Sequence, residues 1–103
     1  MAKTPEAKVK DKIKKILETY DIYYAMPHGA GFGNAGVPDF LCCFKGKFLA
    51  IEAKANGGAV TALQIKHLNE IDKAGGVTWI INETNVYVFE AFLKINLEAN
   101  KDG

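Results

Sequence analysis

Three charged residues stand in segments that are otherwise apolar: Asp39, Glu52 and Lys54. Asp39 comes just before the apolar run 40–44, and Glu52 lies near the end of the apolar run 48–53. A strand covered on both faces does not carry a lone charge, because an unpaired buried charge costs several kcal/mol. Glu52 and Lys54 are two residues apart and therefore project from the same face of a strand.

The length of the turn between the two apolar runs decides whether Asp39 lies on the same face of the sheet as Glu52 and Lys54. A two-residue turn at Lys45-Gly46 pairs Phe44 with Lys47 and places Asp39 opposite Glu52, about 5 Å apart at Cβ. A three-residue turn would move Asp39 to the other face unless a bulge restored the register. We therefore expect the short turn or a bulge.

Two neighbouring carboxylates repel each other unless a cation lies between them. Oxygen ligands of this kind suit Mg²⁺ or Mn²⁺, with waters and a substrate phosphate completing the coordination. Lys54 adds a positive charge that can hold an attacking water or stabilise developing negative charge. The alternative is an ion pair of Lys54 with Glu52 or Asp39 and no metal.

Two residues outside the hairpin are further candidates. Glu6 lies on the apolar stripe of the first predicted helix, although a first-turn carboxylate is also favoured by the helix dipole alone. Gln64 follows Thr61 by three residues, which is the spacing of a capping box. Because Gln64 also aligns with apolar residues of its helix, its amide could face the sheet and the metal instead.

Periodicity and turn residues predict the elements that carry these side chains. Helices are expected over residues 5–20 and 61–74, strands over 22–26, 40–44, 48–53 and 77–81, and a glycine-rich loop over 27–36. Residues 86–99 fit a helix that Asn85 could cap, and a fifth strand over 86–89 is the alternative. The apolar hairpin predicts an α/β fold, a sheet of about four strands with helices on both sides.

Length and composition narrow the class of protein. The 103 residues fit one domain, 1–103, and 49% hydrophobic content is ordinary for a globular protein. No apolar run reaches the roughly 20 residues that span a bilayer, so we expect no membrane association and a cytoplasmic location. Cys42 and Cys43 are neighbours and point to opposite faces, so they form neither a disulfide nor a metal site together.

The lysines are unevenly distributed. Six of 13 lie in the first 15 residues, and the chain contains no arginine. They fit either a solvated helix face or a patch facing nucleic-acid phosphates, for which Lys8, Lys12 and Lys15 are candidates. Without the arginine fork that reads guanine edges, recognition of DNA should depend on backbone and shape.

The loop from His28 to Gly36 contains a G-x-G-x-x-G match. A dinucleotide site would require a helix directly after it, but Val37-Pro38 and a strand follow. We expect instead a loop that approaches the substrate closely, with His28 and Asn34 as candidate phosphate contacts.

Gly36-Val37-Pro38-Asp39, followed by Glu52-Ala53-Lys54, resembles the PD-(D/E)xK nuclease signature. The order of helix, strand, G-x-PD strand, E-x-K strand, T-x-x-Q helix, Gly75-Gly76 and strand is similar to the VRR-NUC (virus-type replication–repair nuclease) branch. The similarity runs from about residue 6 to residue 81 and resembles the stand-alone phage or bacterial type.

The resemblance implies a small restriction-endonuclease-like fold and a metal-dependent phosphodiesterase. It assigns the metal to Asp39, Glu52 and the backbone carbonyl of Ala53, and the positioning of the nucleophilic water to Lys54. The positions that complete the site are Glu6 and Gln64. It also implies a homodimer acting on branched DNA. This chain departs from the pattern in having no arginine in the loop before G-x-PD.

We therefore expect a Mg²⁺- or Mn²⁺-dependent, structure-specific DNA endonuclease, since the chain has no sequence-reading domain. The first alternative is a non-catalytic nucleic-acid-binding module with a nuclease-like fold. A structural protein with a buried ion-pair network is a third possibility, which predicts affinity for neither metal nor DNA.

Overall fold

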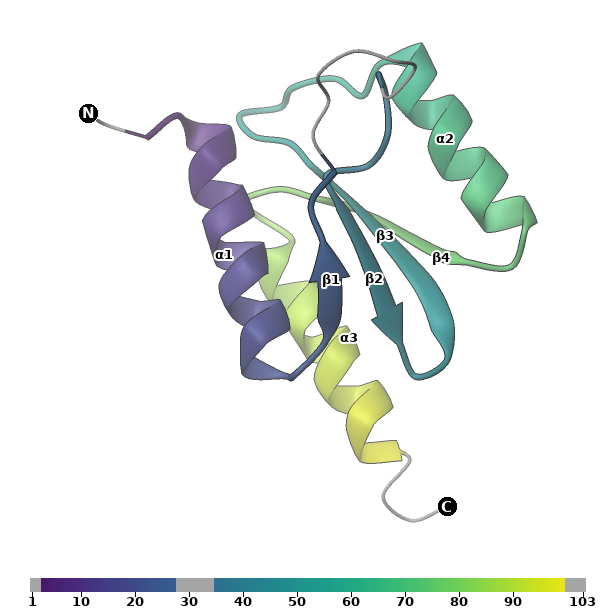
Figure 1. The fold of residues 1–103 in the computed structure, drawn as a ribbon. Helices are drawn as coiled ribbons and strands as arrows, with labels where there is room; N and C mark the ends of the chain where they lie inside the picture. Colours follow the sequence, from purple (N-terminus) through teal and green to yellow (C-terminus); the bar gives the residue numbers. More distant parts are fainter. Residues whose placement is uncertain (1–2, 28–34, 100–103) are drawn as a thin grey trace.

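The computed structural model of the chain describes residues 3–27 and 35–99. Helices and strands follow one another in the order α-β-β-β-α-β-α, as the sequence predicts (Figure 1). The elements are α1 (Pro5–Thr19), β1 (Tyr23–Ala25), β2 (Phe40–Phe44), β3 (Lys47–Ala53), α2 (Ala62–Lys73), β4 (Val77–Ile81) and α3 (Val86–Ala99). No helix within the described ranges is both long and apolar enough to cross a membrane.

The four strands form one mixed sheet in the order β1-β2-β3-β4. β1, β2 and β3 are antiparallel neighbours, and β4 runs parallel to β3. Lys45 (φ 53°) and Gly46 (φ 78°) both adopt positive φ, as a two-residue hairpin turn of type I′ requires. Phe44 pairs with Lys47 and the register continues without a bulge, so the short turn is confirmed.

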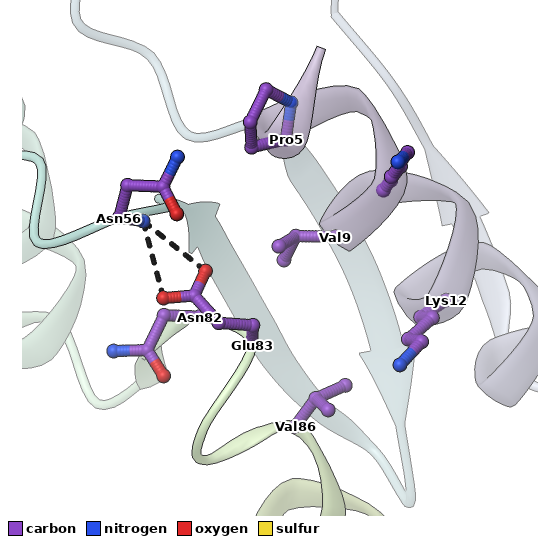
Figure 2. Close-up of a pocket in the computed structure, with 8 residues that line it drawn as sticks. Pro5, Val9, Lys12, Asn56, Asn82, Glu83 and Val86 are labelled. Atoms are coloured by element: carbon purple, nitrogen blue, oxygen red, sulfur yellow. Dashed lines mark hydrogen bonds between the residues drawn. The ribbon is translucent and has the colours of Figure 1, made fainter. Parts of the chain in front are cut away.

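α1 and α3 pack together against one face of the sheet, whereas α2 lies beside β4 on the other face (Figure 1). The core lies between the sheet, α1 and α3, and consists of buried apolar side chains: Val9, Ile13, Leu17, Ile22, Phe40, Cys42, Phe44, Leu49, Ile51, Ala53, Ile81, Val86, Phe89 and Leu93. A cavity remains where the N-terminal parts of α1 and α3 approach the ends of β3 and β4, and Val9 and Val86 lie in its wall (Figure 2).

The opposite face of the sheet is covered only in part. Tyr23 is 76% exposed and Phe48 47% exposed, and Cys43 between them is also exposed. The expectation of a hairpin buried on both faces was therefore wrong for this half of the sheet. The reason is that α2 lies along β4 and does not extend over β1 and β2.

The start of α3 also differs in detail from the prediction. The helix over 86–99 forms, but Asn85 does not cap it with its side chain. Asn85 Oδ1 accepts the Asn82 N–H, and the Asn85 amide donates to the Ile80 carbonyl. Asn82 Oδ1 in turn accepts the N–H groups of Thr84 and Asn85. The two asparagines thus stabilise the turn between β4 and α3.

Candidate active site

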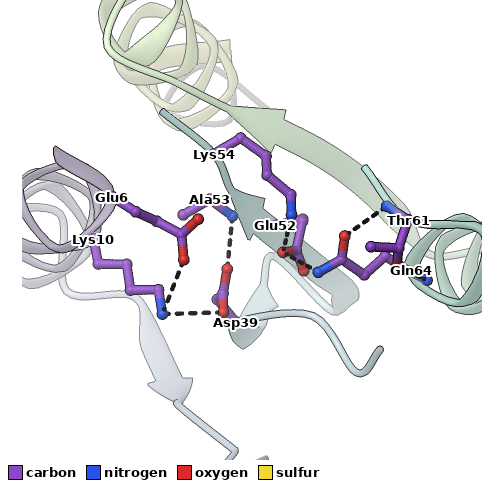
Figure 3. A network of polar contacts seen from close by, with 8 residues as sticks. All are labelled: Glu6, Lys10, Asp39, Glu52, Ala53, Lys54, Thr61 and Gln64. Carbon is purple, nitrogen blue, oxygen red and sulfur yellow. Dashed lines mark hydrogen bonds and ion pairs between the residues drawn. The ribbon is translucent and has the colours of Figure 1, made fainter. Parts of the chain in front are cut away.

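The five predicted catalytic side chains meet at one edge of the sheet (Figure 3). Asp39 precedes β2, whereas Glu52 and Lys54 stand at the end of β3. Glu6 comes from the first turn of α1 and Gln64 from the first turn of α2. At this edge the start of β2 and the end of β3 lie between the N-terminal turns of α1 and α2.

Asp39 is fixed by the main chain of the neighbouring strand. Its Oδ2 accepts the Ala53 N–H at 2.8 Å, and its side chain is 20% exposed. The β2–β3 ladder ends at the pair Phe40–Ile51, and Pro38 has no N–H with which to continue it. Beyond this pair, the Ala53 N–H donates to the Asp39 carboxylate instead of to a main-chain carbonyl of the neighbouring strand. Asp39 therefore lies beside Glu52, as the short turn predicts.

Glu52 is almost fully buried, with 3% of its surface exposed. Its Oε2 accepts the Gln64 Nε2–H at 3.0 Å and lies 3.9 Å from the Lys54 ammonium. Burial, and then the negative charge of Asp39, raise the pKa of Glu52 to about 8, against the opposing effect of Lys54. Without a further cation, Glu52 therefore retains a proton at neutral pH.

Gln64 performs both tasks that its position allows. Its Oε1 accepts the Thr61 N–H at 2.9 Å, while Thr61 Oγ1 accepts the Gln64 N–H at 3.2 Å, which completes the capping box. The capping bond fixes which side of the amide is oxygen, so that Nε2 faces Glu52. The start of α2 and the orientation of Glu52 are therefore linked through one side chain.

Lys10 is a member of this cluster that the sequence reasoning missed. Its ammonium lies 3.4 Å from Asp39 Oδ1 and 3.7 Å from Glu6 Oε2 (Figure 3). Glu6 is 46% exposed at its side chain and reaches Asp39 only through this lysine. The i,i+4 spacing of Glu6 and Lys10 was a signal for their pairing, but not for the contact with Asp39.

The donor set fits an oxygen-preferring divalent cation. Within residues 3–27 and 35–99 there is no group of three or more His, Cys, Asp or Glu side chains that could hold a metal. Mg²⁺ is, however, usually bound by one or two carboxylates together with waters and substrate phosphate. Asp39 and Glu52 supply two such carboxylates. Burial raises the pKa of Glu52 most, and the negative charge of Asp39 raises it further; a cation would relieve this second contribution.

The candidate nucleic-acid contacts fall into two groups. Lys8, Lys12 and Lys15 are exposed on α1, on a different side of the helix from Glu6. Lys12 Nζ lies 3.3 Å from the Tyr87 hydroxyl. His28 and Asn34 lie outside the described residues.

Comparisons with protein-family models, curated proteins and solved structures found no match to this chain. The functional conclusion therefore depends on the residues and their geometry.

Proposed function

We propose that the protein is a metal-dependent, structure-specific DNA endonuclease that hydrolyses phosphodiester bonds. The observation that carries this proposal is the pairing of Asp39 with the buried Glu52 beside the Lys54 ammonium. A protein that only binds DNA gains nothing from two adjacent carboxylates, because they repel phosphate. A divalent cation makes the same pair useful for hydrolysis.

Asp39, Glu52 and the Ala53 carbonyl would hold the Mg²⁺ or Mn²⁺. When bound, such an ion supplies an activated water and neutralises charge on the scissile phosphate. Glu52 must lose its proton for this purpose, and Gln64 keeps its Oε2 oriented through the 3.0 Å hydrogen bond. The Lys54 ammonium, 15% exposed at its side chain, can hold the attacking water or a phosphate oxygen.

The proposal includes a homodimer. So small a domain offers little surface with which to hold branched DNA. The exposed side chains of Tyr23, Cys43 and Phe48 form a row across β1, β2 and β3, because Tyr23 pairs with Cys43 and Cys43 with Phe48. An apolar row of this kind favours association with a second copy.

The test is cleavage of labelled linear, flapped and four-way-junction DNA in Mg²⁺, Mn²⁺ or EDTA. Asp39→Asn keeps the size of the side chain but removes its charge, so we expect cleavage to fall at least about 100-fold. Glu70→Gln, an exposed α2 position, is the matched control and should cut normally.

Cleavage that persists in EDTA or in Asp39→Asn would contradict the proposal. DNA binding without cleavage of any substrate would favour the non-catalytic binding module. If neither Mn²⁺ nor DNA bound at all, the cluster would be a structural ion-pair network.

A further inference from the structure

A groove runs between α1 and α3, and the core residues Val9 and Val86 form part of its lining. It consists of a cavity of about 220 Å³ beside Pro5, Val9 and Asn56 (Figure 2) and an adjoining one of about 330 Å³ beside Lys15 and Tyr87. Lys12 and Val86 line both cavities, so the two lie next to each other. Each is of the size that holds one or two small ring systems rather than a large cofactor.

One wall of the groove is basic. Lys8, Lys12 and Lys15 follow each other on α1 at spacings of four and three residues, which places them along one side of the helix over about 10 Å. Neither Lys8 nor Lys15 forms an ion pair with any residue that the structure describes. Their positive charges remain available to an anionic ligand.

The acidic residues in the groove are already hydrogen-bonded. The Glu83 carboxylate accepts the Asn56 N–H at 3.1 and 3.2 Å. The Glu90 carboxylate accepts the Tyr20 hydroxyl at 3.0 Å. These bonds hold the two acids in place on the side of the groove opposite the lysines.

Tyr87 supplies an exposed aromatic ring beside these lysines. It is 63% exposed, whereas Phe89 and Phe92 of the same helix pack against Trp79. The Lys12 ammonium lies 5.4 Å from the centre of the Tyr87 ring. A basic wall next to an exposed aromatic ring is the arrangement with which proteins bind single-stranded nucleic acid, because bases stack on the ring while lysines follow the backbone.

One end of the groove adjoins the candidate active site. Pro5 is next to Glu6 in the chain, and Asn56 follows Lys54 by two residues. A strand that leaves the groove at this end would therefore pass beside the chain segments that carry Glu6 and Lys54.

We propose that the groove between α1 and α3 binds an unpaired strand of DNA, with a base stacked on Tyr87 and phosphates on Lys8 and Lys15. This inference deepens the proposed nuclease function by naming the part of the substrate that is held. The inference rests on the proposed function only in expecting the bound strand to lead to the candidate active site. A duplex would touch only the rim of cavities of about 220 and 330 Å³, whereas single bases can enter them.

The test is fluorescence anisotropy in EDTA, which measures binding without cleavage. The probes are a short labelled oligothymidylate and a hairpin duplex of equal nucleotide count. We expect Tyr87→Ala to weaken oligothymidylate binding about tenfold and Tyr87→Phe to retain it, because stacking needs the ring and not the hydroxyl. Lys8→Ala and Lys15→Ala should each reduce the salt slope by about 0.7.

Two exposed positions of α3 outside the groove serve as controls: Ile95→Ala and Lys94→Ala should bind like the wild type. Unchanged oligothymidylate binding by Tyr87→Ala, with its thermal midpoint also unchanged, would overturn the inference. So would equal affinity of the wild type for the duplex. Because this experiment measures binding and not cleavage, neither result contradicts the proposed nuclease activity. A failure of cleavage alone would likewise not contradict the binding of a strand in the groove.

Discussion

Glu52 is the one charged residue that is buried in the described part of the protein, and its surroundings oppose its ionisation. Its pKa of about 8 lies above the ordinary 4.5, so between these values the folded chain holds a proton that the unfolded chain has lost. The free energy of unfolding of the metal-free protein should therefore fall as pH rises from about 5 to 8. The metal should bind more tightly over the same range, because it competes with this proton.

Glu52→Gln tests this reasoning, because it keeps the shape and removes the titration. We expect urea unfolding in EDTA to show Glu52→Gln as more stable than the wild type at pH 8, with less of the decline between pH 5 and 8. Glu70→Gln should follow the wild-type curve. Parallel curves for Glu52→Gln and wild type would show that Glu52 is already ionised.

Lys10 holds a positive charge against the same acidic cluster. A divalent ion at Asp39 would be repelled by the ammonium 3.4 Å from Oδ1. We expect Lys10→Met to lower the Mn²⁺ dissociation constant about fivefold. Two unit charges about 4 Å apart in water repel each other by about 1 kcal/mol, and the ion carries twice the charge but would lie farther from the ammonium. Calorimetric titration with Mn²⁺ measures this directly, with Lys14→Met on the exposed side of α1 as control. Weaker binding in Lys10→Met would instead mean that the lysine organises the ligands.

The part of the site that depends on turns and helix caps could be predicted from the sequence. The two-residue turn at Lys45-Gly46 was sufficient to bring Asp39 beside Glu52, and the capping spacing located Gln64. Lys10 could not be predicted, because six lysines share the N-terminal segment and only the packing of α1 decides which one meets Asp39.

At the scale of elements, the approach to Asp39 depends on a close contact with α2. Gly36 has φ +83°, and a Cβ there would lie 2.7 Å from Leu63 Cγ and 3.0 Å from the Leu63 carbonyl carbon. No larger residue fits without moving the start of α2, whose Gln64 contacts Glu52. Gly36 is therefore required in the G-x-PD segment for two reasons: it adopts a positive φ, and it has no side chain that would collide with Leu63.

Gly36→Ala and Gly46→Ala form a matched pair, because Gly46 has a similar φ of +78° but open space at its Cβ position. We expect Gly46→Ala to lose about 1–2 kcal/mol of unfolding free energy from backbone strain alone. Gly36→Ala should lose about 1–3 kcal/mol more, from overpacking against Leu63. Urea denaturation measures both, and equal losses would mean that α2 moves aside at little cost.

Element types followed from periodicity, including the helix at residues 86–99, because apolar spacing specifies a helix that packs against a sheet. The partial exposure of the sheet could not be predicted in this way. The residues of α2 specify a helix with one apolar side, but not which strands it will cover.

At the scale of the whole molecule, the uncovered row of Tyr23, Cys43 and Phe48 is where we expect a second copy to bind. Phe48→Asp should shift sedimentation equilibrium towards the monomer, because it would bury a charge in the interface. Val88→Asp, at a position 59% exposed on α3, is the control and should remain dimeric. A wild-type protein that is monomeric at all concentrations would rule out the dimer.

The bond between the Ala53 N–H and Asp39 Oδ2 makes one amide a spectroscopic reporter of the site. Every other acceptor along this part of the β2–β3 ladder is a neutral carbonyl, whereas this amide donates to a carboxylate. Its proton resonance in a ¹⁵N-correlated NMR spectrum should therefore shift when the charge on Asp39 is neutralised by a cation or removed in Asp39→Asn. A single resolved peak can thus follow the occupancy of the site without substrate and without turnover.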